Sequence, residues 1–383
     1  MKPIIYFDNS ATTRPYNEVI EKMNYISLND YGNASSLHSM GITAQKHLND
    51  SRLKIANALN VDKSEIYFSS GGTESNNIAV WGCLKANTKA RKHVITSKVE
   101  HPSILEIFKQ LEIEGYIVDY INVDKNGVIL LNELESLINK DTALVCIIHV
   151  NNEVGTIQPL KEISRIIKVK NKNTLFHVDA VQSFGKIKIN PKQCGIDLLS
   201  MSAHKIHGPK GVGALYKDKN IKISPVIYGG GQESKIRSGT ENVPGICGFG
   251  LACEIIHEGI DKNREIISEL KAYFIELLKS LEIEHKILLP EKSIQNILSV
   301  SFPDTKSEVV LRCLQEKNIF ASAGSACSSR KSLKSHVLRA VSLDKKIIDG
   351  TIRFSFSEFN TLEEINYTAK VLKTITNRFK NLK

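Results

Sequence analysis

The sequence predicts an α/β protein with a mostly parallel sheet in a large domain, followed by a smaller α+β domain. Between about residues 50 and 230, helical stretches alternate with short runs rich in isoleucine and valine, which is the pattern of an α/β domain. These runs are continuously apolar, as is typical of strands that are covered on both faces in a parallel sheet. Beyond about residue 290 the alternation ends and the chain changes character.

Six apolar runs are the expected strands of the large sheet, and helices lie between them. The runs occupy residues 65–68, 93–96, 116–120, 143–148, 174–178 and 198–201. Residues 248–281 then place apolar side chains at helical spacing. We expect one long helix there, which joins the two domains.

The smaller domain is expected to contain two strands with a helix between them. The strands occupy residues 296–302 and 351–356, and the helix about 307–318. The chain closes on an amphipathic helix. Its start is indicated by Thr361 and Glu364, which have the spacing of a capping box.

Composition and charge exclude several classes of function. The formal net charge is +10, but the lysines are spread along the chain, so we expect no direct binding of nucleic acid. No apolar run approaches the ~18 residues of a membrane span, and Asp8 precedes any apolar region of a signal peptide, so we expect a cytoplasmic protein without a membrane segment. The seven cysteines include no C-x-x-C pair, so neither a disulfide framework nor a metal site is expected.

Polar clusters follow several of the expected strands, at the edge where an open α/β sheet binds its ligand. The small residues at 69–72 followed by Thr73 are suited to bind a phosphate at a helix start, although the same pattern is an ordinary way to begin a helix. Asp179 ends an apolar run, where a carboxylate is costly to bury unless it meets a cation. The protonated pyridine nitrogen of pyridoxal phosphate is such a cation, while a helix cap explains Asp179 equally well.

Lys205 lies just past the last of the six runs, among serine, histidine and glycine residues. A lysine that is shielded there can lose its charge and form a Schiff base. His204 and His207 have no partner cluster at the spacing of metal ligands, which argues against a metal.

Cys327 lies in a run of small residues at 322–329 and is followed by the cations Arg330, Lys331 and Lys334. Such a segment has little apolar surface that buries a cysteine, so we expect an exposed loop. Positive charge beside a thiol lowers its pKa, and the thiolate is the nucleophile. From the loop alone, an incidental surface thiol is an equally good interpretation.

Taken together, these clusters resemble the cysteine desulfurases of the NifS/IscS type, within the class-V aminotransferase branch of the fold-type I enzymes that use pyridoxal 5'-phosphate. The resemblance covers essentially the whole chain. The stretches that carry it are 6–13, 32–36, 70–77, 100–101, 149–155, 177–182, 202–213, 237–245, 324–327 and 352–355. It implies a large cofactor-binding domain at 15–257, and a small domain made of 1–14 with 258–383 that carries the catalytic cysteine loop.

The resemblance also implies a set of cofactor contacts. Lys205 would hold the cofactor covalently, Asp179 would pair with its pyridine nitrogen, and Gln182 would hydrogen-bond its ring hydroxyl oxygen. His101 would stack on the ring as a further catalytic residue, and Thr240 would come from the second subunit of a homodimer. The implied cofactor-binding residues are Gly72, Thr73, His101, Asn152, Asp179, Gln182, Ser202, His204, Lys205 and Thr240.

The implied reaction converts L-cysteine to L-alanine. Arg353 would bind the substrate carboxylate with help from Asn152, Lys205 would remove the Cα proton, and Cys327 would take the sulfur as a persulfide. The sulfur acceptor would be an iron-sulfur scaffold, a tRNA-thiolating enzyme or another carrier. A selenocysteine lyase and another class-V aminotransferase remain alternatives, because they share the cofactor site without depending on Cys327.

Overall fold

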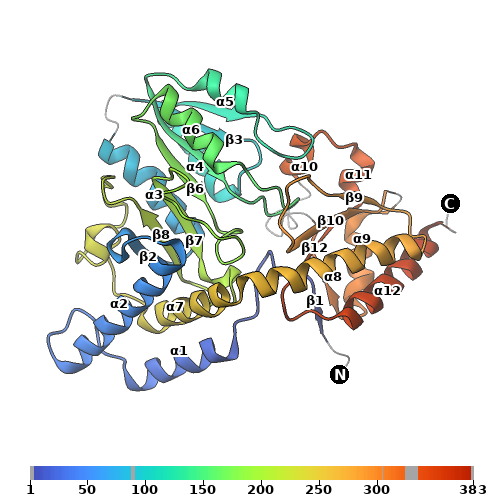
Figure 1. The fold of residues 1–383 in the computed structure, drawn as a ribbon, viewed down its shortest axis with the longest axis horizontal. Helices are drawn as coiled ribbons and strands as arrows, with labels where there is room; N and C mark the ends of the chain where they lie inside the picture. The colour runs from blue at the N-terminus through green and yellow to red at the C-terminus, as the bar shows by residue number, and fades with distance from the viewer. Residues whose placement is uncertain (1–3, 88–90, 304, 324–334, 381–383) are drawn as a thin grey trace.

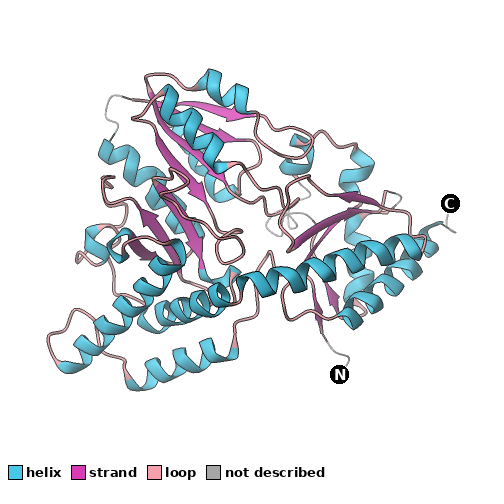
Figure 2. Cartoon of the chain, viewed as in Figure 1, coloured by secondary structure: helices cyan, strands magenta, loops and turns pink. Residues whose placement is uncertain are grey.

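The computed structural model describes residues 4–87, 91–303, 305–323 and 335–380. A large sheet with helices on both faces makes one part of the molecule, and a second group of strands and helices makes the other (Figure 1). Figure 2 shows that helices form most of the outer surface and that strands lie inside both parts. This arrangement confirms the predicted fold class.

The large sheet has seven strands in the order β2-β8-β7-β6-β5-β3-β4. β8 is antiparallel to both of its neighbours, and the other pairs are parallel, so the sheet is mostly parallel as predicted. All six predicted strands are present, with ends that differ by one residue. The strands are β2 (Ile66–Ser69), β3 (His93–Ser97), β4 (Ile117–Ile121), β5 (Thr142–Ile148), β6 (Leu175–Asp179), β7 (Leu198–Ser202) and β8 (Gly213–Lys217).

Strand β8 was not among the predicted strands, because its apolar residues follow a glycine-rich stretch that reads as a loop. Its first residue, Gly213, pairs with Ser69 at the end of β2. A Cβ atom on Gly213 would lie 2.7 Å from the backbone of Gly71, so only glycine allows this approach. The start of β8 thereby packs directly against the turn that precedes α3 (Gly72–Asn87).

Helices cover both faces of the large sheet. In β5, Leu144 and Cys146 pack into a core with α3 and α4, whereas Val145 and Ile147 pack into a second core on the opposite face. This alternation explains why the run is apolar at every position. The helices of this part are α1 (Asn17–Asn29), α2 (Ser39–Leu59), α3 (Gly72–Asn87), α4 (Pro102–Ile113), α5 (Leu131–Leu137), α6 (Leu160–Lys170) and α7 (Val243–Glu258).

The predicted single helix at 248–281 is wrong. The structure has two helices, α7 (Val243–Glu258) and α8 (Ile260–Ser280), whose axes differ by 71°. The break falls at Gly259, which weakens a helix because glycine loses the most backbone entropy on folding. Within the described part of the chain, no single helix is long and apolar enough to cross a membrane. Among the described helices, only the bent pair of α7 and α8 reaches that length and apolar composition, when the two helices are counted together.

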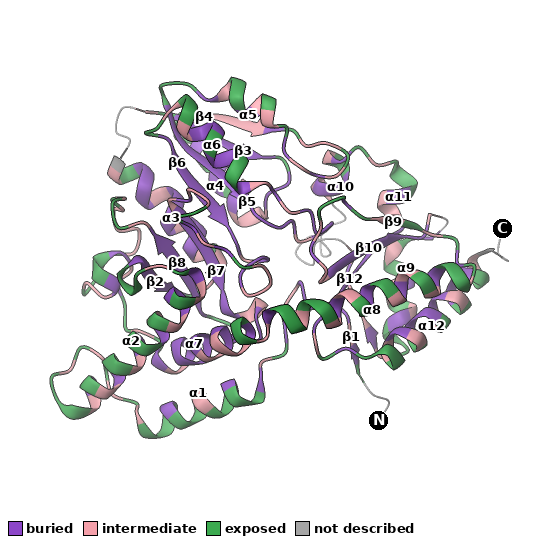
Figure 3. Ribbon diagram, in the orientation of Figure 1, coloured by how far each residue is buried: buried purple, intermediate pink, exposed green. Residues whose placement is uncertain are grey.

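The second part has a core of its own, and Figure 3 shows buried residues along its strands β10 and β12. Ile5 and Phe7, near the start of the chain, pack in this core with residues from α8, the small sheet and α12. The predicted domain boundaries stay a prediction. The elements are β1 (Ile5–Tyr6), β9 (Lys286–Leu288), β10 (Ile297–Ser301), α9 (Ser307–Gln315), β11 (Ile319–Phe320), α10 (His336–Ala340), α11 (Lys345–Asp349), β12 (Thr351–Ser355) and α12 (Leu362–Lys380).

The strands of this part form two small sheets. β10 pairs antiparallel with β9 and β12, and β1 pairs parallel with β11. The predicted capping box at the start of α12 is confirmed. The backbone N–H of Glu364 donates to Thr361 Oγ1 at 3.3 Å, and the backbone N–H of Thr361 donates to Glu364 Oε2 at 3.2 Å.

Candidate active site

A cavity of about 240 Å³ lies at the carboxyl ends of β2, β5, β6 and β7. It is large enough for an organic molecule, because about 10–15 Å³ on the same measure already holds one water. Ten of the predicted site residues line it: Gly72, Thr73, His101, Asn152, Asp179, Gln182, Ser202, His204, Lys205 and Arg353.

Two predicted site residues do not join this set. Thr240 is exposed and does not line the cavity of its own chain. Cys327 lies outside the described residues, as do Arg330, Lys331 and Lys334. Their roles stay predictions.

One end of the cavity is built to bind an anion. α3 begins at Gly72 and presents its first N–H groups there, where the helix dipole favours negative charge. Ser202 Oγ is buried and has no hydrogen-bond partner among the described residues, so it is available to a ligand. A Cβ atom on Gly72 would lie 2.6 Å from Val181 Cγ2, which explains the glycine at this position.

His204 stands beside this anion site. Its Nδ1 lies 3.2 Å from Thr12 Oγ1. Burial, together with the charges of Lys205 and Lys210, lowers the pKa of His204 to about 4. The ring is therefore neutral at pH 7, and it would contact an anion as a polar group rather than as a cation.

Asp179 ends β6 with its carboxylate in the wall of the cavity, and its residue is almost wholly buried. Its Oδ1 accepts from the backbone N–H of Val181 at 3.0 Å, and its Oδ2 accepts from Asn76 Nδ2 at 2.9 Å. The bond to Val181 closes a turn, and no helix follows Asp179 before β7, so the alternative interpretation of Asp179 as a helix cap is wrong. A cationic ligand group there would compensate the buried charge.

Asn76 was given no role in the sequence analysis, although it orients Asp179. Its side chain is fully buried in α3, and Nδ2 donates to both Asp179 Oδ2 and Ser103 Oγ at 2.9 Å. Asn76 lies three residues after Thr73 and thus on the same side of the helix. The three-residue spacing from Thr73 is therefore the signal in the sequence that could have indicated Asn76 as a site residue.

His101 is the N-cap of α4. Its Nδ1 accepts a hydrogen bond from the backbone N–H of Ser103 at 3.1 Å, so the proton of the neutral ring is on Nε2. Burial lowers the pKa of His101, and the Asp179 carboxylate partly opposes this effect. The ring is therefore neutral, which suits stacking against a flat aromatic ligand.

Lys205 is held by the N-terminal segment of the chain. Its Nζ donates to the backbone oxygens of Ser10 at 2.5 Å and Ala11 at 2.8 Å. The Ser10 oxygen also accepts from Gln182 Nε2 at 2.9 Å. Residues almost 200 positions apart in sequence therefore aim the lysine amine into the cavity.

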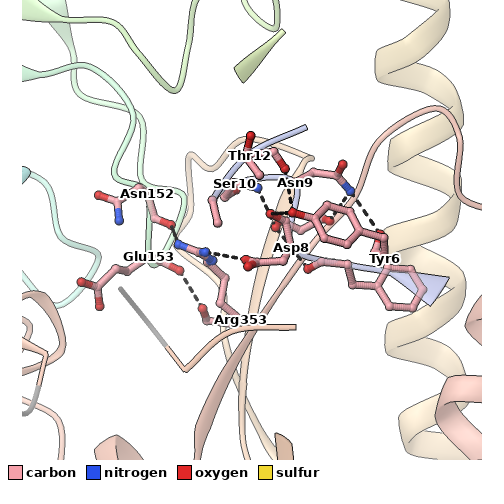
Figure 4. Close-up of polar contacts among 12 residues, drawn as sticks. Tyr6, Asp8, Asn9, Ser10, Thr12, Asn152, Glu153 and Arg353 are labelled. Atoms are coloured by element: carbon pink, nitrogen blue, oxygen red, sulfur yellow. Dashed lines mark hydrogen bonds and ion pairs between the residues drawn. The ribbon is translucent and has the colours of Figure 1, made fainter. Parts of the chain in front are cut away.

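Arg353 reaches the cavity from β12 of the second part (Figure 4). Its side chain is only 1% exposed, and the guanidinium donates to Asn152 O and Asp8 Oδ1, each at 2.8 Å. The Nε atom is buried and has no hydrogen-bond partner among the described residues. N–H groups thus remain for a carboxylate, while Asp8 already neutralises the charge.

Comparisons with known proteins agree with this geometry. The family model described as Aminotransferase class-V matches residues 5–368. A cysteine desulfurase IscS of Methanosarcina thermophila is 42% identical over 99% of this chain and 93% of its own. A cysteine desulfurase of Nostoc sp. is 40% identical over 99% of this chain and 94% of its own. A solved NifS-like protein superposes with a TM-score of 0.93 at 42% identity, covering 98% of this chain and all of the other.

The fold and the cavity thus define a class-V aminotransferase, an enzyme class that depends on pyridoxal 5'-phosphate. Within this class, the chain belongs to the cysteine desulfurase family. The cavity residues fit the cofactor, because Ser202 Oγ and the start of α3 suit its phosphate and the Asp179 carboxylate suits its pyridine nitrogen.

Proposed function

We propose that this protein is a pyridoxal-phosphate-dependent cysteine desulfurase that converts L-cysteine to L-alanine and transfers the sulfur to Cys327 as a persulfide. The observation that supports it most is one cavity lined by the Lys205 amine, the Asp179 carboxylate and the Arg353 guanidinium. An amine, a counter-ion for a pyridinium and a carboxylate receptor are what a cofactor-dependent reaction of an amino acid requires.

The chain's own residues would hold the cofactor at three points. Lys205 would bind it covalently, and Asp179 would pair with the ring nitrogen. The phosphate would lie against Gly72, Thr73, Ser202 and His204. When bound, pyridoxal phosphate supplies an electron sink that weakens the bonds at Cα and Cβ of the substrate. His101 would cover the ring with its neutral imidazole.

Substrate binding and proton transfer would use two further sets of contacts. The unpaired N–H groups of Arg353 would bind the substrate carboxylate, together with Asn152, which already accepts a hydrogen bond from Arg353. The Lys205 amine would take the proton from Cα, and the Ser10 and Ala11 oxygens would hold it in place.

Sulfur transfer would use Cys327, and the residues that flank its segment support this role. Ser322 exchanges two backbone hydrogen bonds with Arg353, and Ser335 Oγ donates to Glu153 Oε2 at 2.5 Å. Both flanks are thus attached beside the substrate-binding residues. The Cys327 thiolate would form an S–S bond as the Cβ–S bond breaks, and the electron pair left on Cβ would be protonated to give alanine.

The assembly of the protein is also part of the proposal. Thr240 is exposed and does not line the cavity of its own chain, so it is available to the cavity of a second copy, and we propose a homodimer. The persulfide would pass to an iron-sulfur scaffold, a tRNA-thiolating enzyme or another carrier protein. A cytoplasmic location rests on the sequence prediction alone.

The decisive experiment incubates the cofactor-loaded protein with L-cysteine, weighs the tryptic peptide that contains Cys327 and measures alanine. We expect one added sulfur on that peptide and an equal amount of alanine. Cys327→Ser is expected to abolish the adduct, Lys205→Ala is expected to abolish alanine, and Cys313→Ser, a matched change on α9, is expected to leave both intact. Alanine without an adduct would refute sulfur transfer to Cys327, and turnover retained in Cys327→Ser would favour the alternative class-V reactions.

A further inference from the structure

Lys186 is a partly buried titratable residue that the proposed reaction does not use. It lies in the turn that follows Asp179 and Gln182, and its Nζ is 3.2 Å from Gln182 Oε1. Burial lowers the pKa of Lys186 to about 7, and the Lys205 charge acts in the same direction. Keeping such a lysine costs free energy, which suggests that its amine serves a purpose.

Lys186 contacts the site from behind. It lines a second cavity of about 20 Å³, with room for about one water, together with Lys205, His207 and Glu358. Lys205 lines both this cavity and the larger one, whereas Lys186 lines only the smaller one. The Lys186 amine therefore lies close to the cofactor-binding residues without reaching the cofactor cavity.

The neighbours of Gln182 determine the orientation of its amide. The Ser10 carbonyl oxygen only accepts hydrogen bonds, so the amide nitrogen Nε2 must face it, at 2.9 Å. The Lys186 amine has an N–H to donate in both of its protonation states, so Oε1 suits it. Both neighbours thus favour the same orientation, and Nε2 retains one further N–H for the cofactor cavity that Gln182 lines.

We propose that Lys186 is a positioning residue, which holds the Gln182 amide so that it presents a donor and not an acceptor to the ring oxygen of the cofactor. This inference rests on the proposed function. A hydrogen bond from a donor favours the deprotonated ring oxygen, whereas an acceptor would favour the protonated one. Without Lys186, one of the two contacts that fix the amide is lost.

The test measures the absorption spectrum of the cofactor-loaded protein at one pH and without substrate. Pyridoxal phosphate bound to a lysine absorbs in different bands when its ring oxygen is protonated and when it is deprotonated. We expect Lys186→Met to shift the ratio of the bands toward the protonated form by about tenfold, which is the effect of one hydrogen bond. Lys188→Met is the matched control, because Lys188 is exposed and pairs with Asp261 at the surface. It is expected to keep the wild-type ratio.

Three further variants make the test specific. If Lys186 acts through Gln182, the double variant Gln182→Leu with Lys186→Met gives the ratio of Gln182→Leu alone. Lys186→Arg keeps a donor and is expected to retain the wild-type ratio. Lys186→Leu replaces the methionine variant if that one does not fold.

Several results would overturn the inference. One is a wild-type ratio of the absorption bands in Lys186→Met, with or without a lower melting temperature. Another is a double variant in which the effects of Gln182→Leu and Lys186→Met on that ratio add. A ratio in Lys186→Arg as altered as in Lys186→Met would also contradict it. Failure of the proposed function would be seen separately, as a wild-type protein with normal absorption bands that forms no persulfide.

Discussion

Replacing Asp8 by asparagine is expected to destabilise the protein by about 3 kcal/mol, because it leaves the buried Arg353 guanidinium without its anionic partner. In the structure, Arg353 Nη2 donates to Asp8 Oδ1 at 2.8 Å, and the Arg353 side chain is 1% exposed (Figure 4). Asparagine retains a similar shape and an acceptor oxygen. The substitution therefore removes the charge while it preserves the packing.

The magnitude follows from the burial of the two partners. Removing one partner of a buried ion pair costs about 3–5 kcal/mol, because an uncompensated charge stays in a medium of low dielectric constant. The Asp8 side chain is 19% exposed, so water partly screens the pair, and the lower end of that range applies.

Urea unfolding of the cofactor-free protein at pH 7, at one protein concentration, measures the effect. Asp261→Asn is the matched control. Its ion pair with Lys188 has an N–O distance of 2.6 Å but exposed partners, at 55% and 62%, and such pairs contribute about 0–1 kcal/mol. A free energy of unfolding for Asp8→Asn within about 0.5 kcal/mol of that for Asp261→Asn would refute the reasoning.

Three further predictions concern stability measured by urea unfolding. Burial lowers the pKa of His177 to about 3, so the unfolded state takes up a proton that the folded state does not, and the free energy of unfolding falls as the pH drops below about 6.5. His177→Gln is therefore expected to lose less free energy of unfolding than wild type between pH 7.5 and pH 5. Equal losses in the two proteins would contradict this. Burial raises the pKa of Glu100 to about 8, so the folded state retains a proton that the unfolded state releases, and stability falls as the pH rises from 4.5 to 8. Glu100→Gln is expected to gain stability relative to wild type over that interval. A difference in the free energy of unfolding between the two proteins that stays constant with pH would argue against it. Thr361→Ala is expected to lower the free energy of unfolding by about 1 kcal/mol, because the cap of α12 is lost. The control Thr374→Ala, at an exposed position within the same helix, is expected to lower it by less than about 0.5 kcal/mol. Equal decreases in the two variants would show that the cap is not the cause.

The parts of the fold that local pattern governs were predictable. The six apolar runs are strands because both faces of the sheet are covered, and the capping box of Thr361 and Glu364 involves residues only three apart. β8 was missed because a run of Ala-Leu-Tyr after several glycines has too few residues to show a period. The bend at Gly259 was missed because the apolar spacing continues across it, so periodicity alone does not reveal a change of axis.

The residues of the candidate site also fall into two groups, those that a local sequence pattern predicted and those that it missed. Lys205 and Asp179 were predicted because each is a polar residue at the end of an apolar run, and the carboxyl ends of parallel strands meet at one edge of the sheet. Asn76 and Asp8 were missed because their partners are distant in sequence: 103 residues separate Asn76 from Asp179. No local pattern shows such a pair.

The sequence by itself therefore determined the class of fold, the strand ends that carry polar residues and the family to which the chain belongs. These depend on hydrophobic periodicity and on short motifs, which are properties of neighbouring residues. Only the tertiary structure decided which polar groups meet. Arg353 and Asp8, 345 residues apart, form a buried ion pair because the N-terminal strand packs against the C-terminal core, and Lys205 donates to the backbone oxygens of Ser10 and Ala11, almost 200 positions away. The physical reason is that such contacts exist only once burial has excluded water and brought distant segments together.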